Sequence, residues 1–317
     1  MNRFERLLNG ATHEARIVEI GPSYSPAAPK SGGWNTHVVD HTTQQVLREK
    51  YGPAGVDLEA IEPVDTIWTG GALHDALPPD LLGTADILIA SHLFEHLPDP
   101  VGFLDSAARL LKESGRISLA IPDRRFCFDF FKSPTCTGDI LEAHAQHRSR
   151  HGLRVAWAER AYAVTMNGLL GWDTTARGVP AFMSDFSAAA ATWHRYADAP
   201  DAPYEDFHAW YFTPAAFELI VLELGQLGLS DWRIDSIDGP FGFEFFATLR
   251  RGALRYTDTA ELQEQRMTLL RRQLLEQRDW IELALAPDGT AGAPVQNAAP
   301  AGSLSQRLRR LFGGGPA

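Results

Sequence analysis

Five short apolar runs, each ending at a turn or a polar residue, alternate with helical or irregular segments over the first 125 residues. The runs are 16–21, 36–40, 64–68, 86–90 and 116–121. Runs of this length between polar turns are typical of buried β-strands. Their alternation with helical patterns predicts an α/β domain with a mostly parallel sheet.

The connection between the fourth and fifth runs contains a polar segment that could take part in ligand binding or catalysis. A polar segment, 91–98, leads to Asp99, which suits an N-cap, and to Pro100, which suits the first position of a helix. Apolar residues at helical spacing then predict a helix that is closed by Gly115. Open α/β sheets bind ligands at the carboxyl ends of their strands, so we expect the site at 91–98 and 122–123.

The sheet is predicted to close with a hairpin near the C-terminus. Thr213–Pro214 is a second helix start, and the apolar runs 232–237 and 243–249 flank a cluster of turn-forming residues. These segments predict one sheet domain made of residues 1–123 and 208–252.

Residues 124–207 do not follow the alternation of strands and helices. Together with the five residues that follow, this stretch contains half of the aromatic residues of the chain. Most of these rings must pack in a core, but exposed ones would suit the C–H faces of a carbohydrate. We expect a mainly helical insert that caps the carboxyl edge of the sheet and receives an acceptor molecule.

The C-terminal part is expected to form a helix and a tail. In 257–286 apolar residues step by threes and fours, which predicts a helix that either packs on its own domain or docks another protein. A second copy of the chain or a glycosyltransferase would bind through 258–286. Residues 287–317 are rich in Ala, Pro and Gly and are predicted to be a disordered tail.

Composition narrows the classes of function. The chain has 317 residues, 44% of them hydrophobic, and a net charge of −11, which disfavours nucleic acid as a partner. No run of 18 apolar residues occurs, so no membrane span is expected. Cys127 and Cys136 match no metal-ligand spacing and form no disulfide framework. These features predict a cytoplasmic protein.

The ends of the first two predicted strands suit a nucleoside-containing cofactor. Gly21 closes the first strand and would let the backbone approach a ligand, while Glu19 precedes it. Asp40 closes the second strand, where an acid accepts hydrogen bonds from both ribose hydroxyls. The pattern alone is common in α/β proteins.

Five segments carry a family resemblance: Val18–Gly21, Val39–Asp40, Ala85–Leu88, Glu95–Pro100 and Leu110–Lys112. With them the chain resembles class I S-adenosylmethionine-dependent methyltransferases over about residues 14–123 and 208–250. Glu95–Pro100 is the most specific segment. The resemblance implies a Rossmann-like, mostly parallel sheet closed by a C-terminal antiparallel hairpin, with S-adenosylmethionine as the cofactor.

The resemblance also implies cofactor contacts. Asp40 would hold the ribose, the loop 71–73 would border the adenine, and Ser91 with His92 would lie beside the methyl sulfonium. The full implied set is Glu19, Gly21, Pro22, Ser23, Asp40, His41, Gly71, Ala72, Leu73 and Ser91. The family's second and third glycines are replaced here by residues 22–26, and three prolines before Lys30 leave little room for its first helix.

A narrower resemblance concerns the acceptor. Residues 19–35 and 123–129 are similar to methyltransferases encoded with bacterial surface-polysaccharide enzymes. A sugar hydroxyl is a weak acid and would need a base, for which the candidates are His92, His96, His208 and Asp123. The candidates for acceptor contact are Arg124, Trp210 and Tyr211. For Glu95 we expect a structural role, and for His96 a helix cap is as good an interpretation as a base.

Three other functions use the same architecture. Nicotinamide binding favours a Gly-x-Gly-x-x-Gly turn, which this chain lacks, and this favours the methyltransferase interpretation. Methylation of a non-sugar metabolite is an alternative within enzymes. A non-catalytic adaptor that keeps the fold and binds through its C-terminal helix is an alternative of another class.

A histidine row is the remaining motif. His144, His147 and His151 would share one face if 139–151 were a helix. The row could bind a metal ion or acidic groups, but three arginines nearby favour a basic face that is solvated or meets a phosphate or sugar acid. No metal site is expected.

Overall fold

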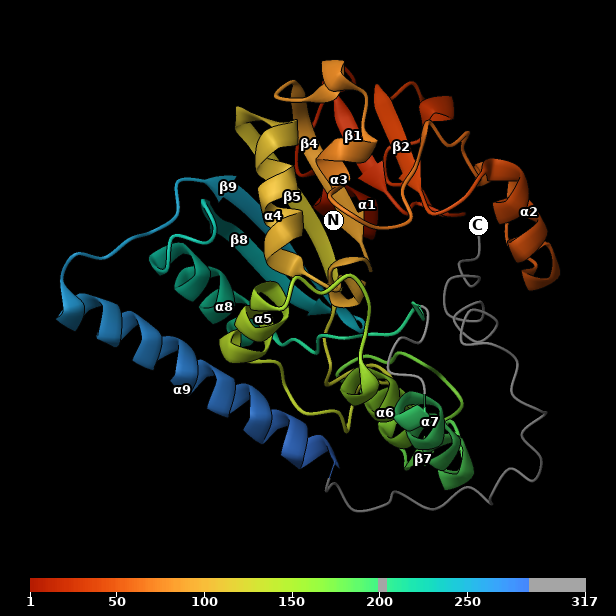
Figure 1. Ribbon diagram of the computed structural model, residues 1–317, viewed down its shortest axis with the longest axis vertical. Coiled ribbons are helices and arrows are strands. Elements are labelled where there is room, and N and C mark those ends of the chain that lie inside the picture. Colours follow the sequence, from red (N-terminus) through yellow and green to blue (C-terminus); the bar gives the residue numbers. More distant parts are fainter. Residues whose placement is uncertain (199–203, 285–317) are drawn as a thin grey trace.

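The computed structural model describes residues 1–198 and 204–284. Its centre is a seven-stranded sheet in the order β3-β2-β1-β4-β5-β9-β8 (Figure 1). The strands are β1 (Ile17–Ile20), β2 (Thr36–Asp40), β3 (Thr66–Ile67), β4 (Ala85–Ser91), β5 (Leu111–Pro122), β8 (Trp232–Phe241) and β9 (Glu244–Arg251). Strands β1 to β5 are parallel, and β9 runs antiparallel to both β5 and β8. The predicted Rossmann-like sheet with its closing hairpin is confirmed.

Successive side chains along each strand point to opposite faces of the sheet, and both faces are apolar. Residues such as Val18 face the larger core, where helices α4 (Pro100–Leu110) and α8 (Pro214–Gln226) cover the sheet. Their neighbours, such as Ile17, face a smaller core that is covered by helix α1 (Arg3–Leu8). Helix α4 has its expected N-cap but ends at Leu110 rather than at Gly115, because β5 already begins at Leu111.

The crossover from β1 to β2 contains no α-helix, only the 3-10 turn η1 (Lys30–Gly32). The buried carboxylate of Glu19 holds this crossover against the sheet. It accepts hydrogen bonds from the backbone N–H of Ala27 at 2.7 Å and of Ala28 at 3.1 Å. The two hydrogen bonds to Glu19 therefore hold a crossover that has no α-helix. The three prolines of this segment are consistent with that.

The insert leaves the sheet after β5 and returns before α8. It contains α5 (Thr137–Ala145), α6 (Leu153–Tyr162), the hairpin β6 (Val164–Met166) with β7 (Pro180–Phe182), and α7 (Phe186–Asp198). Figure 1 shows it beyond the carboxyl end of β5. Its two ends meet, since Asp123 and Phe212 form a parallel bridge and the N–H of Arg124 donates to the Phe212 carbonyl. The assignment of 124–207 as an acceptor cap stays a prediction.

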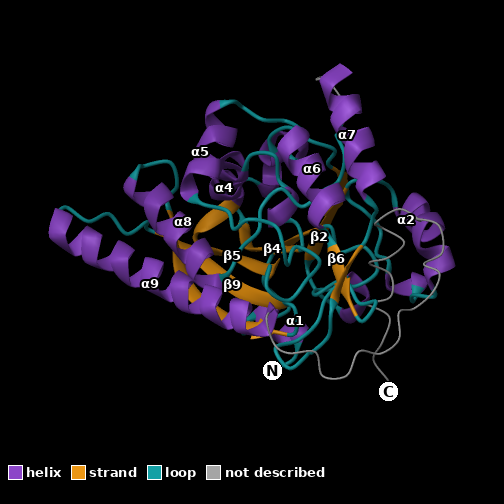
Figure 2. Ribbon diagram, turned by 90° about the horizontal axis from the view of Figure 1, so that it is seen from below, coloured by secondary structure: helices purple, strands orange, loops and turns teal. Residues whose placement is uncertain are grey.

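The remaining helices are α2 (Gln44–Tyr51), α3 (Leu73–Ala76) and α9 (Thr259–Ala284). Figures 1 and 2 both show α9 alongside α8. Arg266 and Arg272 of α9 form ion pairs with Glu223 and Glu218 of α8 at 2.7 and 2.6 Å. One face of the predicted C-terminal helix therefore packs on its own domain.

The other face of α9 exposes apolar side chains, among them Met267, Leu270 and Leu274. Binding of a second copy or a glycosyltransferase through 258–286 stays a prediction. The predicted tail, 287–317, lies outside the described residues. Within the described ranges, none of the helices has the length and apolar character that crossing a bilayer requires.

Candidate active site

A cavity of about 870 Å³ opens at the carboxyl ends of β1, β2 and β4. The ends of β1 and β2 and the loop 68–73 form one wall, and the elbow after β4 forms the second. Residues of the insert, including Phe128, Leu170 and Tyr204, close the third side. The cavity lies at the sheet edge where the sequence predicts the site.

The first wall fits a ribose. Gly21 has a left-handed φ of 65°, and no atom lies within 4 Å of where its Cβ would be. The Asp40 side chain is buried, and its Oδ1 accepts a 2.7 Å hydrogen bond from the N–H of His41. Its Oδ2 is buried with no hydrogen-bond partner among the described residues. An unpaired buried carboxylate oxygen beside a cavity is suited to accept a hydrogen bond from a ligand hydroxyl.

Most of the predicted cofactor residues lie on this wall. The lining residues from that set are Gly21, Ser23, Asp40, His41, Gly71, Ala72 and Leu73. Glu19, Pro22 and Ser91 do not line the cavity, and their assignment to the cofactor site stays a prediction. Glu19 is occupied by the crossover, and the Ser91 hydroxyl accepts a hydrogen bond from the Arg3 guanidinium.

The elbow after β4 is sharply bent. His92 has a left-handed φ of 50°, which is uncommon for a residue with a Cβ and occurs at functional sites. The 3-10 turn Phe94–His96 follows, and Asp99 then caps α4 by accepting from the N–H groups of Val101 and Gly102. After this bend the His92 ring contacts Glu244, the first residue of β9.

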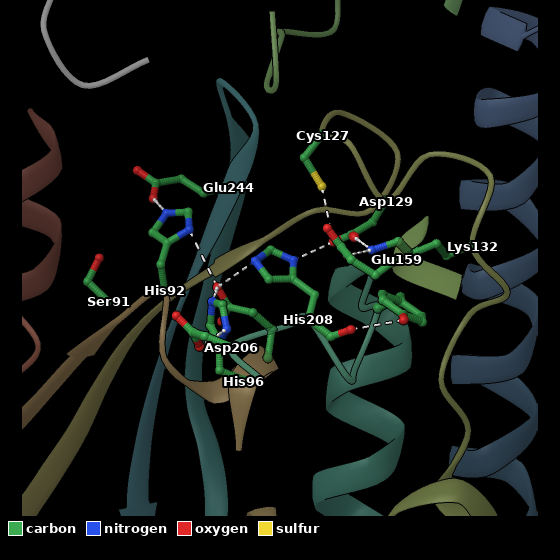
Figure 3. Close-up of polar contacts among 12 residues, drawn as sticks. Ser91, His92, His96, Cys127, Asp129, Lys132, Glu159, Asp206, His208 and Glu244 are labelled. Atoms are coloured by element: carbon green, nitrogen blue, oxygen red, sulfur yellow. Dashed lines mark hydrogen bonds and ion pairs between the residues drawn. The ribbon is translucent and has the colours of Figure 1, made fainter. Parts of the chain in front are cut away.

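Three imidazoles meet at this elbow (Figure 3), and each has a carboxylate on one ring nitrogen. His92 Nε2 lies 2.7 Å from Glu244 of β9. His96 Nδ1 lies 2.9 Å from Asp206, and His208 Nδ1 lies 2.7 Å from Asp129. The partners come from the closing hairpin and from the insert, so the elbow is joined to both.

The other nitrogen of each ring faces one buried carboxylate, that of Glu95. The distances to Glu95 Oε1 are 3.5 Å from His92 Nδ1, 3.8 Å from His96 Nε2 and 3.7 Å from His208 Nε2. These separations are too long for hydrogen bonds. We call the four residues His92, Glu95, His96 and His208 the His–Glu cluster.

The charges around the cluster shift several pKa values. Burial alone would lower the pKa of His96, but the carboxylates of Asp206 and Glu95 raise it to about 9. Burial alone would also lower the pKa of Lys132, which is fully buried behind the cluster, but its partners Asp129 and Glu159 raise it above the usual value. The wall is therefore a connected array of acids and bases.

Three of the four predicted catalytic residues lie together. His92, His96 and His208 all line the cavity. Asp123 does not, because it is fully buried and both its oxygens are bound by the Arg125 guanidinium at 2.9 and 2.6 Å. The prediction of a catalytic role for Asp123 is wrong, since its carboxylate is engaged and shielded.

Two of the three predicted acceptor residues are also in the core. The Arg124 guanidinium donates to the carbonyls of Phe130 and Lys132, and the indole Nε1 of Trp210 donates to the Leu97 carbonyl at 2.6 Å. Neither side chain lines the main cavity, so the structure gives no support to their predicted contact with an acceptor. Tyr211 lines a second cavity of about 530 Å³ under the insert.

The histidine row is not a row in the structure. Helix α5 ends at Ala145, and His147 has a left-handed φ of 49°, so 139–151 is not one helix. His144 Nδ1 lies 3.0 Å from the Asp99 carboxylate, His147 lines the main cavity, and His151 is buried.

Sequence reasoning missed the carboxylates that hold the imidazoles. Glu244 and Asp129 are single charged residues between phenylalanines, in 243–246 and 128–131. A charge inside such an apolar run rarely stays buried without a partner, and this signal could have identified both. Asp206 has no comparable signal.

The fold and the cavity together define an α/β enzyme with a site for a nucleoside-containing cofactor. A model of the methyltransferase domain family matches residues 11–225. The chain belongs to this family, and its methyl donor is S-adenosylmethionine. No curated protein matches the sequence.

Several solved structures are similar to the chain. The CcbJ methyltransferase from Streptomyces caelestis is 13% identical, with 79% of this chain and 89% of that chain covered and a TM-score of 0.41. A putative Zn-dependent alcohol dehydrogenase from Rhodobacter sphaeroides is 10% identical, with 78% and 88% covered and a TM-score of 0.39. The DhpI complex with SAH is 13% identical, with 74% and 76% covered and a TM-score of 0.35.

Proposed function

We propose that this methyltransferase transfers a methyl group to a sugar hydroxyl in bacterial glycan biosynthesis. The observation that supports it best is the His–Glu cluster, which faces the ribose wall across one cavity. A sugar hydroxyl is too weak an acid to react unaided at neutral pH, so its methylation requires a base where donor and acceptor meet. The imidazoles of His92 and His208 line the cavity at this point and would supply that base.

The roles of the residues follow from their places. The unpaired Asp40 Oδ2 would accept a hydrogen bond from the ribose, and Gly21 with the loop 70–73 would leave room for the backbone to border the cofactor. The bound cofactor supplies an electrophilic methyl group. An imidazole of the cluster takes the hydroxyl proton, while the elbow and the insert orient the acceptor and exclude water.

The cavity also suits an acceptor with many hydroxyls. Beyond the cluster it is lined by Asp99, His147, Arg148 and Asp206, which offer both donors and acceptors of hydrogen bonds. The second cavity is lined by aromatic residues, and Trp193 exposes half of its surface there. Carbohydrate C–H faces pack well on such rings.

The test is a search for the product. The protein is incubated with S-adenosylmethionine and a panel of nucleotide sugars and glycan precursors, and mass spectrometry seeks a gain of one methylene unit. We expect a sugar in the panel to be O-methylated. Methylation of non-sugar metabolites alone, in a parallel panel of phenols, amines and carboxylates, would overturn the sugar assignment and leave the alternative acceptor. Binding of α9 partners without turnover on either panel would support the adaptor alternative.

A further inference from the structure

We propose that Glu95, His96 and His208 bind a divalent transition-metal ion in the wall of the cavity. The sequence gives no hint of this site, because two of its ligands are neighbours in the elbow and the third is more than a hundred residues away, at the return of the insert. The role that we assign to the ion rests on the proposed function, but its binding does not.

The distances fit a metal ion. Glu95, His96 and His208 each offer one ligand atom, and these three atoms all lie within 4.8 Å of one another. Bonds of about 2.1 Å in a tetrahedral arrangement put ligand atoms about 3.4 Å apart. Glu95 Oε1 is 3.8 Å from His96 Nε2 and 3.7 Å from His208 Nε2, so shifts of a few tenths of an ångström would bring the oxygen to that separation from each nitrogen.

The orientation of the His96 and His208 imidazoles also fits a metal ion. His96 and His208 are nearly perpendicular, at 87°, with ring centroids 4.5 Å apart. Asp206 and Asp129 sit at their Nδ1 atoms, and this carboxylate contact is what metal-bound histidines ordinarily make with the nitrogen that is not bound to the metal. With a proton at Nδ1, each Nε2 faces Glu95 and can bind a metal ion, which in His96 would displace the second ring proton.

Glu95 supplies an independent observation. It is 1% exposed, and neither of its oxygens has a hydrogen-bond partner among the described residues. An unsatisfied buried carboxylate is costly. A cation bound between Glu95 and the two imidazoles would remove this cost.

The net charge of the residues joined to the His–Glu cluster also favours a bound cation. The acidic residues joined to the cluster are Glu95, Asp129, Glu159, Asp206 and Glu244. Among the described residues, Arg3 pairs with Glu244, and Lys132 pairs with Asp129 and Glu159. Even with His96 protonated the network carries a net negative charge, which a divalent ion would offset.

The donor set indicates the class of ion. Two imidazoles and one carboxylate suit Zn²⁺, Fe²⁺, Mn²⁺ or Co²⁺ rather than Ca²⁺. Because both imidazoles line the cavity, the remaining coordination positions would face the acceptor. There the ion would bind the acceptor hydroxyl and lower its pKa. The O–H proton would pass to His92, the oxygen would bond to the methyl carbon, and the C–S bond would break to leave the neutral thioether.

Cobalt binding tests the site directly. The full chain is treated with a chelator, titrated with Co²⁺, and followed by visible absorption and calorimetry, with Zn²⁺ as a competitor. We expect one ion per chain and the absorption bands of nitrogen-ligated Co²⁺. Glu95→Gln, which keeps the shape of the side chain, and His208→Ala should each weaken binding at least 100-fold. His13→Ala, at a stacked pair outside the cavity, should bind as the wild type does.

Two results would overturn the site: less than one ion per chain under saturating Co²⁺, or unchanged affinity in Glu95→Gln, whose native fold circular dichroism would verify. The assigned role is tested separately. Equal methyl-transfer rates in the metal-free and loaded proteins would overturn the role. An intact metal site in a protein that methylates only non-sugar acceptors would overturn the acceptor proposal instead and leave the metal proposal standing.

Discussion

Replacing Asp40 with Asn puts an amide NH₂ where the unpaired carboxylate oxygen Oδ2 faces the cavity. The retained oxygen can still accept from the His41 N–H, so the local backbone should hold its shape. What is lost is at least one hydrogen bond from a ribose hydroxyl to an ionised acceptor, which contributes about 1.5–3 kcal/mol. The expected rise in Kd is about 10- to 150-fold.

Calorimetry with S-adenosylhomocysteine measures this change without any acceptor. The matched control is Asp105→Asn, an exposed acid on α4 that pairs with Arg109, and this variant should bind as the wild type does. Melting temperatures of both variants verify that the comparison is between folded proteins. A Kd for Asp40→Asn within twofold of the wild-type value would refute the reasoning, because Oδ2 would then have no ligand to hold.

Three further predictions concern buried groups. Burial raises the pKa of Glu19 from 4.5 to about 7, so its contribution to stability is present below pH 4.5 and is lost as the pH rises through 7. Urea unfolding at pH 5 and pH 8 should show a loss that Glu19→Gln lacks, of up to about 3 kcal/mol. Burial raises the pKa of the Cys127 thiol well above its usual range, so a thiol reagent should label only exposed Cys136 rapidly, and Cys136→Ser should abolish that fast phase. Lys132→Met should cost about 3–5 kcal/mol in urea unfolding because it leaves two buried carboxylates without their partner, and a cost below 1 kcal/mol would contradict the buried ion pairs.

The strands and the elbow helix could be predicted because their signals are local. Asp99 and Pro100 mark the start of α4 whatever the rest of the chain does, and strand-terminal Gly21 and Asp40 fall at the cavity because parallel strands end at one edge. The end of α5 could not be predicted in the same way. His147 adopts a left-handed φ without being glycine, and no local rule requires that.

Only part of the site could be predicted from the sequence, because the rest is formed by contacts between residues that lie far apart along the chain. Glu244 reaches His92 from a strand 152 residues further along the chain, and Asp206 reaches His96 from the return of the insert. The role of Trp210 could not be predicted for a related reason. An aromatic residue near a predicted site can either contact an acceptor or pack in the core. Trp210 packs in the core, where its indole N–H donates to the Leu97 carbonyl.

The bridge between Asp123 and Phe212 makes the insert an excursion that begins and ends at one point of the sheet. Lengthening or exchanging the residues between these two anchors would leave the register of β5 against β4 and β9 unaltered. Under the predicted assignment of the insert as an acceptor cap, the acceptor side of the site could change while the sheet that carries Asp40 stays in place. An engineer could transplant the excursion as a module, provided that the returning arm still delivers Asp206 and His208 to the elbow.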